Sequence, residues 1–164
     1  MKIYLAGPDV FDPNPLAVGE ELKAGARRHG FVPLYPLDNA IQTDDPNPSL
    51  TIYKANIALI ADADAVVANL NPFRGAEPDS GTVWEVGYAL GLGKRVIGYI
   101  GSGEPMVGRV LVNEGRTVPP VGPYFDEENR SIEDFGHPLN LMLMHSIEHL
   151  AIGSFEDALQ YLTV

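Results

Sequence analysis

Two acidic residues six positions apart are the feature of this sequence that could carry out chemistry. Asp79 lies in a polar loop, and Glu85 follows near the start of an apolar helical segment. Glycosidic-bond chemistry uses two carboxyl groups in different environments, one as the nucleophile and one to move a proton. The pair therefore suggests that Glu85 attacks a carbon while Asp79 delivers a proton to the leaving group.

Each of these residues also has a structural interpretation. The run from Thr82 to Glu85 (TVWE) matches a helix capping box, in which Glu85 would fold back onto the amide of Thr82. Asp79 would then be a solvated loop carboxylate or the N-cap of the same helix. Tyr4, near the end of the first apolar run, is either a core tyrosine or a hydrogen-bond donor to a catalytic carboxylate. Both interpretations remain open from the residues alone.

A histidine motif near the C-terminus suggests a metal site, which we do not expect to exist. The stretch from His145 to His149 (HSIEH) matches a zinc-protease signature, and on a helix its two histidines would share one face. A match of five residues is common by chance, and the flanks offer no obvious third ligand. No segment has a Walker or dinucleotide fingerprint between a strand and a helix. We therefore expect neither a metal nor a cofactor.

The elements that must position these residues alternate along the chain. Apolar runs predict strands and helical spacing predicts helices, in the order strand Lys2–Ala6, helix Leu16–His29, strand Phe31–Tyr35, helix Leu50–Ala61, strand Ala63–Leu70, helix Thr82–Leu92, strand Arg95–Ile100, helix Leu139–Ile152 and helix Phe155–Leu162 with Ser154 as N-cap. Residues 101–136 are interpreted as loops with room for one short element. Such alternation indicates an α/β domain with a parallel sheet. Its ligand would bind beyond the carboxyl ends of the strands, near residues 7–12, 36–42 and 71–81.

Composition limits the remaining classes of function. A chain of 164 residues with 45% hydrophobic content suits one domain, residues 1–164. The net charge of −11 disfavours binding to nucleic acid and to anionic membranes. With no cysteine, the chain has no disulfide, thiolate metal site or cysteine nucleophile. The sequence shows neither a signal peptide nor an apolar run of membrane-spanning length, so we expect a cytoplasmic protein.

Taken together, these segments resemble the nucleoside 2-deoxyribosyltransferase family. The matching pieces follow one another over nearly the whole chain: residues 3–8 (IYLAGP) with Phe11, residues 36–39 (PLDN), residues 56–57 (NI), residues 63–87 with PFRG, PDSGT and WEVG, and residues 138–142 (PLNLM). The resemblance implies a flavodoxin-like, doubly wound parallel sheet in a three-layer α/β/α arrangement. It also implies a homo-oligomer whose active sites are shared between subunits.

The resemblance also implies roles for particular residues. Glu85 in WEVG would be the nucleophile, Asp79 in PDSGT would act on the base and its proton, and Tyr4 would hold Glu85 in place. Asn140 and Met142 in LNLM would reach into the site of the adjoining subunit.

Further positions are expected to bind the substrate. Asn56 stands where some members of the family have an aspartate that helps bind the base, and this departure leaves the base preference open. Gly7, Phe11, Asp38 and Asn39 are expected to form pocket walls.

The expected activity is base exchange between 2′-deoxynucleosides and free nucleobases, as in purine salvage. It would proceed by double displacement through a 2-deoxyribosyl ester of Glu85, with slow hydrolysis when no acceptor base is present. One alternative is a 2′-deoxynucleoside 5′-monophosphate N-glycosidase, for which only Arg74 and the amides of residues 80–82 offer phosphate donors. Another is a non-catalytic, flavodoxin-like nucleotide sensor. Purine-only or general base specificity, and the size of the oligomer, are left open.

Overall fold

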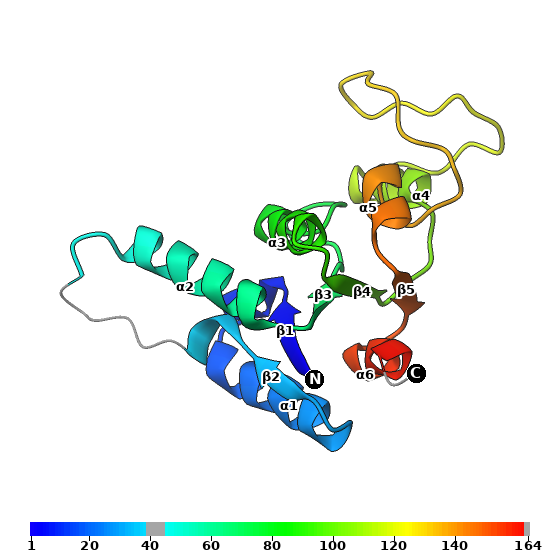
Figure 1. The fold of residues 1–164 in the computed structure, drawn as a ribbon. Coiled ribbons are helices and arrows are strands. Elements are labelled where there is room, and N and C mark those ends of the chain that lie inside the picture. The colour runs from blue at the N-terminus through cyan, green and yellow to red at the C-terminus, as the bar shows by residue number, and fades with distance from the viewer. Residues whose placement is uncertain (39–44, 163–164) are drawn as a thin grey trace.

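The computed structural model describes residues 1–38 and 45–162 as alternating strands and helices (Figure 1). In chain order the elements are β1 (Lys2–Ala6), the 3-10 helix η1 (Pro8–Phe11), α1 (Pro15–Arg28), β2 (Val32–Leu34), the 3-10 helix η2 (Pro36–Asp38), α2 (Pro48–Asp62), β3 (Ala65–Asn69), α3 (Ser80–Gly91), β4 (Arg95–Ile100), α4 (Met106–Asn113), α5 (Leu141–Ser146), β5 (His149–Ile152), α6 (Phe155–Leu159) and the 3-10 helix η3 (Gln160–Leu162).

The strands form one parallel sheet in the order β2-β1-β3-β4-β5. This is the strand order of the flavodoxin-like, doubly wound folds, so the predicted fold class is confirmed. From β1 the chain first adds β2 on one side of that strand, and it then crosses over to add β3 on the other side. The carboxyl ends of β1 and β3 therefore flank the crevice in which such sheets bind ligands.

The two faces of the sheet are covered by different helices, which gives the three-layer α/β/α arrangement (Figure 1). Side chains alternate along β1, so that Ile3 and Leu5 belong to one core cluster and Tyr4 and Ala6 to the other. The first cluster includes residues of α1 and α6, and the second includes residues of α2, α3 and α5. Tyr4 consequently points toward the helix that carries Glu85.

Helix starts follow local side-chain chemistry. Asp79 is the N-cap of α3, and its carboxylate accepts a hydrogen bond from the amide of Thr82. Asn47 caps α2 in the same way. Ser154 caps α6 in a reciprocal capping box with Asp157, which confirms the N-cap predicted there.

The predicted helix over residues 139–152 is confirmed for Leu141–Ser146 and wrong for the residues after it. That segment forms the short helix α5, ends in the extended residue Ile147, and continues as the edge strand β5 paired with β4. Arg95 explains part of the change, because its guanidinium makes two hydrogen bonds with Glu148 and holds the chain beside β4. His145 lies on α5 and His149 on β5, so the two histidines do not share a helix face. No group of potential metal ligands is found among the described residues.

The long region predicted to be mostly loop contains one helix, α4, within residues 101–136. Its apolar face buries Met106, Val107 and Leu111. No helix within residues 1–38 and 45–162 is both long enough and apolar enough to cross a membrane.

Candidate active site

The centre of the site is a hydrogen bond between Tyr4 and Glu85. The Tyr4 hydroxyl, on a fully buried side chain of β1, donates to Oε1 of Glu85 on α3 over 2.6 Å. Asn56 of α2 donates its amide to the same oxygen over 3.5 Å. The capping-box interpretation of Glu85 does not hold, because Asp79 is the N-cap of this helix. The bonds from Tyr4 and Asn56 both end on Oε1, and within the described part of the chain no side chain or backbone amide bonds to Oε2 of Glu85, which leaves that oxygen for a ligand.

Burial sets the ionisation of this carboxyl group. Desolvation, with a smaller contribution from the nearby charge of Asp79, raises the pKa of Glu85 from its ordinary 4.5 to about 7. The hydrogen bonds from Tyr4 and Asn56 act in the opposite direction, because they favour the carboxylate. Burial also raises the pKa of Tyr4 well above its usual range, so its hydroxyl keeps its proton and remains a donor. The Glu85 carboxyl group can therefore titrate close to neutral pH.

Asp79 faces the same cavity from the loop before α3. Its Oδ2 accepts hydrogen bonds from the amide and the hydroxyl of Thr82, at 2.9 and 3.0 Å. Among the described residues, none bonds to Oδ1. The N-cap interpretation of Asp79 is thus correct, and capping fixes one oxygen of a carboxylate that also lines the cavity.

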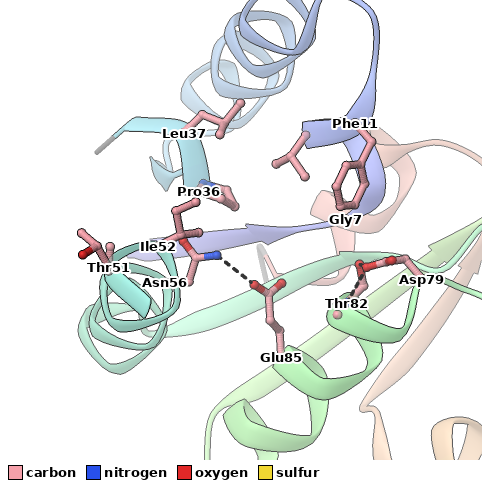
Figure 2. Close-up of a pocket in the computed structure, with 13 residues that line it drawn as sticks. Gly7, Phe11, Pro36, Leu37, Thr51, Ile52, Asn56, Asp79, Thr82 and Glu85 are labelled. Carbon is pink, nitrogen blue, oxygen red and sulfur yellow. Dashed lines mark hydrogen bonds between the residues drawn. The ribbon is translucent and has the colours of Figure 1, made fainter. Parts of the chain in front are cut away.

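The two carboxylates line a cavity of about 340 Å³, a size suited to small-molecule ligands. Figure 2 shows Glu85 and Asp79 along one side, and Phe11 opposite Pro36 and Ile52. The wall comes from η1, η2, α2 and the start of α3, and is formed by Gly7, Val10, Phe11, Pro36, Leu37, Thr51, Ile52, Ala55, Asn56, Asp79, Gly81, Thr82 and Glu85. All three loops predicted to flank the ligand contribute to it.

Gly7 is needed in this wall because the backbone approaches its neighbours closely. A Cβ at this position would lie 2.8 Å from the Cβ of Asn69 and would also collide with the side chain of Asp9. Asn69 in turn donates both its hydrogen bonds to the Asp9 carboxylate, at 3.2 and 3.1 Å. A larger residue at position 7 would therefore displace the start of η1.

Asn140 and Met142 lie away from Glu85 within the same chain. They line a second hollow of about 590 Å³ on the other side of α3, together with Val83, Val86 and Leu90. Asn140 caps α5 and donates to Glu133 over 3.0 Å, whereas the Met142 side chain is 70% exposed. These two residues thus line the second hollow and not the cavity that contains Glu85.

Asp38 and Asn39 are the remaining predicted pocket residues. Asp38 does not line the cavity, because its carboxylate accepts from the amide of Tyr35 over 3.1 Å and pairs with Lys23 at 2.5 Å. Asn39 lies outside the described residues.

Several features of the site were missed at the sequence level. The helix α2 contributes Thr51, Ile52 and Ala55 to the wall, which a helical pattern alone does not orient toward a ligand. Trp84 is 48% exposed beside Glu85 and stacks on Tyr88 with ring centroids 5.2 Å apart. The exposed ring of Trp84 lies directly beside the half-buried Glu85, and the signal available in the sequence was a tryptophan immediately before that acid.

Comparisons with known proteins agree with this architecture. The family model described as "Nucleoside 2-deoxyribosyltransferase" matches residues 3–142 of the chain. An uncharacterized protein of Schizosaccharomyces pombe is 33% identical over 106 residues, which are 62% of this chain and 50% of that protein. The chain therefore spans about half the length of this curated relative.

Solved structures add the three-dimensional likeness. A 2-desoxiribosyltransferase from Leishmania mexicana is 36% identical, with a TM-score of 0.77 over 99% of this chain and 96% of that one. A 2-deoxyribosyltransferase from Bacillus psychrosaccharolyticus is 20% identical, with a TM-score of 0.64 over 98% of this chain and 92% of that one. At that identity, the second likeness concerns the fold.

The raised pKa of Glu85 predicts a pH-dependent gain in stability for Glu85→Gln. Between pH 4.5 and 7 the folded chain binds a proton at Glu85 that the unfolded chain does not, so wild-type stability falls as the pH rises through this window. The neutral glutamine avoids that loss. We expect the free energy of unfolding of Glu85→Gln to exceed that of wild type by roughly 1–3 kcal/mol at pH 8. At pH 4.5 the two free energies of unfolding should be similar.

Urea denaturation across this pH range measures the difference. Glu21→Gln, on the exposed part of α1, is the matched control and should change stability little at any of these pH values. A constant difference between Glu85→Gln and wild type over the whole range would contradict the prediction.

Proposed function

The chain belongs to the nucleoside 2-deoxyribosyltransferase family, and from this premise we propose that it exchanges the bases of 2′-deoxynucleosides by double displacement at Glu85. The observation that carries the proposal is the arrangement of Glu85. It lies in a ligand-sized cavity with one oxygen held by Tyr4, the other available to a ligand, and a second carboxylate on the same side.

In the first step, Oε2 of Glu85 attacks C1′ of the deoxynucleoside as the bond to the base breaks. Asp79, directly or through a water molecule, protonates the departing nitrogen of the base. The product is a free base and a 2-deoxyribosyl ester of Glu85. A deoxy sugar favours this step, because without a 2′-hydroxyl the positively charged transition state forms more easily.

In the second step, a different base enters the cavity and attacks C1′ of the ester. Its proton passes to Asp79, the ester bond to Glu85 breaks, and the sugar leaves with its original configuration. Water in place of the base would give slow hydrolysis. The mostly apolar wall of the cavity limits that side reaction.

The charge of the wall supports a neutral nucleoside as substrate. Among the described residues that line the cavity, two are carboxylates and none is lysine, arginine or histidine. A 5′-phosphate placed there would meet like charges with no basic side chain to neutralise it. We therefore propose the transferase over the 5′-monophosphate N-glycosidase.

Asn56 supports recognition of the base or the sugar. Its Oδ1 is buried and has no hydrogen-bond partner within the described parts of the chain. A buried acceptor without a donor costs about 1–3 kcal/mol, and an N–H or O–H group of a bound ligand would remove that cost. Its Nδ2 faces Glu85, which orients the amide so that Oδ1 remains for the ligand.

We also propose that the enzyme is a homo-oligomer in which Asn140 and Met142 complete the site of a neighbouring subunit. Both line the second hollow rather than the cavity of their own chain; Asn140 is half-buried there and Met142 is mostly exposed. An exposed apolar side chain next to a capping amide is suited to covering the sugar of a substrate bound to another copy. Such a cover would also exclude water from the ester.

Exchange and adduct formation test the main proposal. With deoxyinosine and adenine, we expect deoxyadenosine and hypoxanthine as products, whereas deoxyinosine alone should give only slow release of hypoxanthine. Mass spectrometry of the protein with deoxyinosine should find a 2-deoxyribosyl group on the peptide that contains Glu85.

Glu85→Gln should lose exchange by at least about 10³-fold, since the nucleophile is gone, while its circular dichroism spectrum is unchanged. Rapid hydrolysis that adenine does not affect, or full exchange by Glu85→Gln, would refute the proposal.

The pH dependence of exchange should follow the ionisation of Glu85. Because the nucleophile must be ionised, Glu85 should set the acidic side of the pH profile, on which kcat/KM for deoxyinosine should rise with pH with a midpoint near pH 7. Tyr4→Phe removes a donor that favours the carboxylate, so its midpoint should move to higher pH. A midpoint in Tyr4→Phe at or below that of wild type would show that Tyr4 does not support the ionised form.

Mixing of two inactive variants tests the shared site. Asn140→Ser keeps a side chain able to cap α5 but loses the amide, and Glu85→Gln loses the nucleophile. If sites are shared, co-refolded oligomers should regain up to about a quarter of wild-type exchange, because some sites combine an intact Glu85 with an intact Asn140 of the partner. Activity no greater than the sum of the two variants would contradict sharing.

A further inference from the structure

Phe11 forms a wall of the cavity although its own burial does little to hold it. The side chain is 55% exposed, and none of the residues of η1 is buried. Figure 2 shows the ring on the side of the cavity opposite Pro36 and Ile52. A phenyl ring this exposed would change rotamer freely unless neighbouring side chains restrained it.

Two residues from a distant loop supply that restraint. The ring of Phe73 stacks on Phe11 with centroids 5.4 Å apart and planes 19° from parallel. The Arg74 guanidinium lies 5.1 Å from the centroid of Phe11 and 4.7 Å from that of Phe73. These distances are those of an offset aromatic stack and of cation–π contacts.

The backbone of this loop is bent in a way that presents both side chains to Phe11. Arg74 adopts a left-handed φ of 53°, and Gly75 follows with a φ of 150°. The Phe73 amide closes the bend by donating to the carbonyl of Glu77 over 2.9 Å. A left-handed arginine is unfavourable by itself, so the contacts that it makes must offset that cost.

The positive charge of Arg74 takes part in its contacts with the rings of Phe11 and Phe73. In a chain with a net charge of −11, the described residues offer it no carboxylate within ion-pair distance. The contacts of Arg74 are with the two aromatic rings. On the other side, the Asp9 carboxylate fixes η1 to β3 through Asn69, so Phe11 is restrained through both its backbone and its ring.

We propose that Phe73 and Arg74 are positioning residues that hold the Phe11 ring ready to stack on the nucleobase, and that they thereby set the affinity of the enzyme for the base. This inference rests on the proposed function of the cavity. Neither residue lines the cavity, so both act through Phe11. A ring that is already ordered spares the ligand the entropy of ordering it, which strengthens binding without a new contact.

The test is a double-mutant cycle for binding, made in a Glu85→Gln parent so that no chemistry interferes. Isothermal titration with deoxyinosine gives Kd for Phe11→Leu, for Arg74→Met and for the double variant. We expect Arg74→Met to weaken binding about three- to tenfold in the parent and to have almost no effect once Phe11 is leucine. Arg74→Lys should recover part of the loss, because it restores a cation over the rings.

Matched controls separate this role from general effects of charge or stability. Arg27→Met removes the same charge from the exposed face of α1 and should leave Kd unchanged. In the otherwise wild-type chain, Arg74→Met should raise KM for the base while kcat and the melting temperature stay close to wild type.

The outcomes distinguish the inference from the proposed function. An equal loss from Arg74→Met in both backgrounds, or a loss that is larger for deoxyinosine 5′-monophosphate, would mean that Arg74 contacts the ligand itself and would overturn the positioning role. If neither wild type nor the Glu85→Gln parent binds deoxyinosine or adenine, the proposed function fails and this inference fails with it.

Discussion

The structure depends on keeping one carboxylate in a poorly solvated place without neutralising it. Burial alone would leave Glu85 protonated, and an acid without its charge is a poor nucleophile. The Tyr4 hydroxyl counters this by donating to Oε1, and the elevated pKa of Tyr4 ensures that the donor keeps its proton. The result is a group whose pKa lies near 7, balanced between the two protonation states.

The contact between Tyr4 and Glu85 depends on the position of β1 in the sheet. The alternation of side chains along the strand sends Tyr4 to the face covered by α2 and α3, and the strand order places β1 beside the carboxyl end of β3. Asp79 then begins α3 as its N-cap, six residues before Glu85 on the same helix, and the bonds from Thr82 fix only one oxygen of Asp79. The same helix borders a second hollow on its other side, so both functional surfaces share one rigid support.

Sequence patterns predicted the features that depend on neighbours along the chain. The strands β1, β3 and β4, the start of α6 at Ser154, and the three loops around the cavity could all be inferred from local runs and caps. The edge strand β5 could not, because its residues have a helical spacing and become extended through long-range contacts such as that between Arg95 and Glu148. Likewise, the place of Asp38 depends on Lys23 of α1, which no local pattern reveals.

The aromatic surface beside the active acid has a practical consequence. Trp84 is the single tryptophan of the sequence and immediately precedes Glu85 on α3, with Tyr88 stacked on it and Tyr53 close by. Its emission therefore reports on this helix alone, without an added dye. Because the chain contains no cysteine, one engineered thiol on a chosen loop would be unique and could carry an acceptor fluorophore. The molecule is in this sense already prepared for distance measurements by energy transfer between its central helix and any other part.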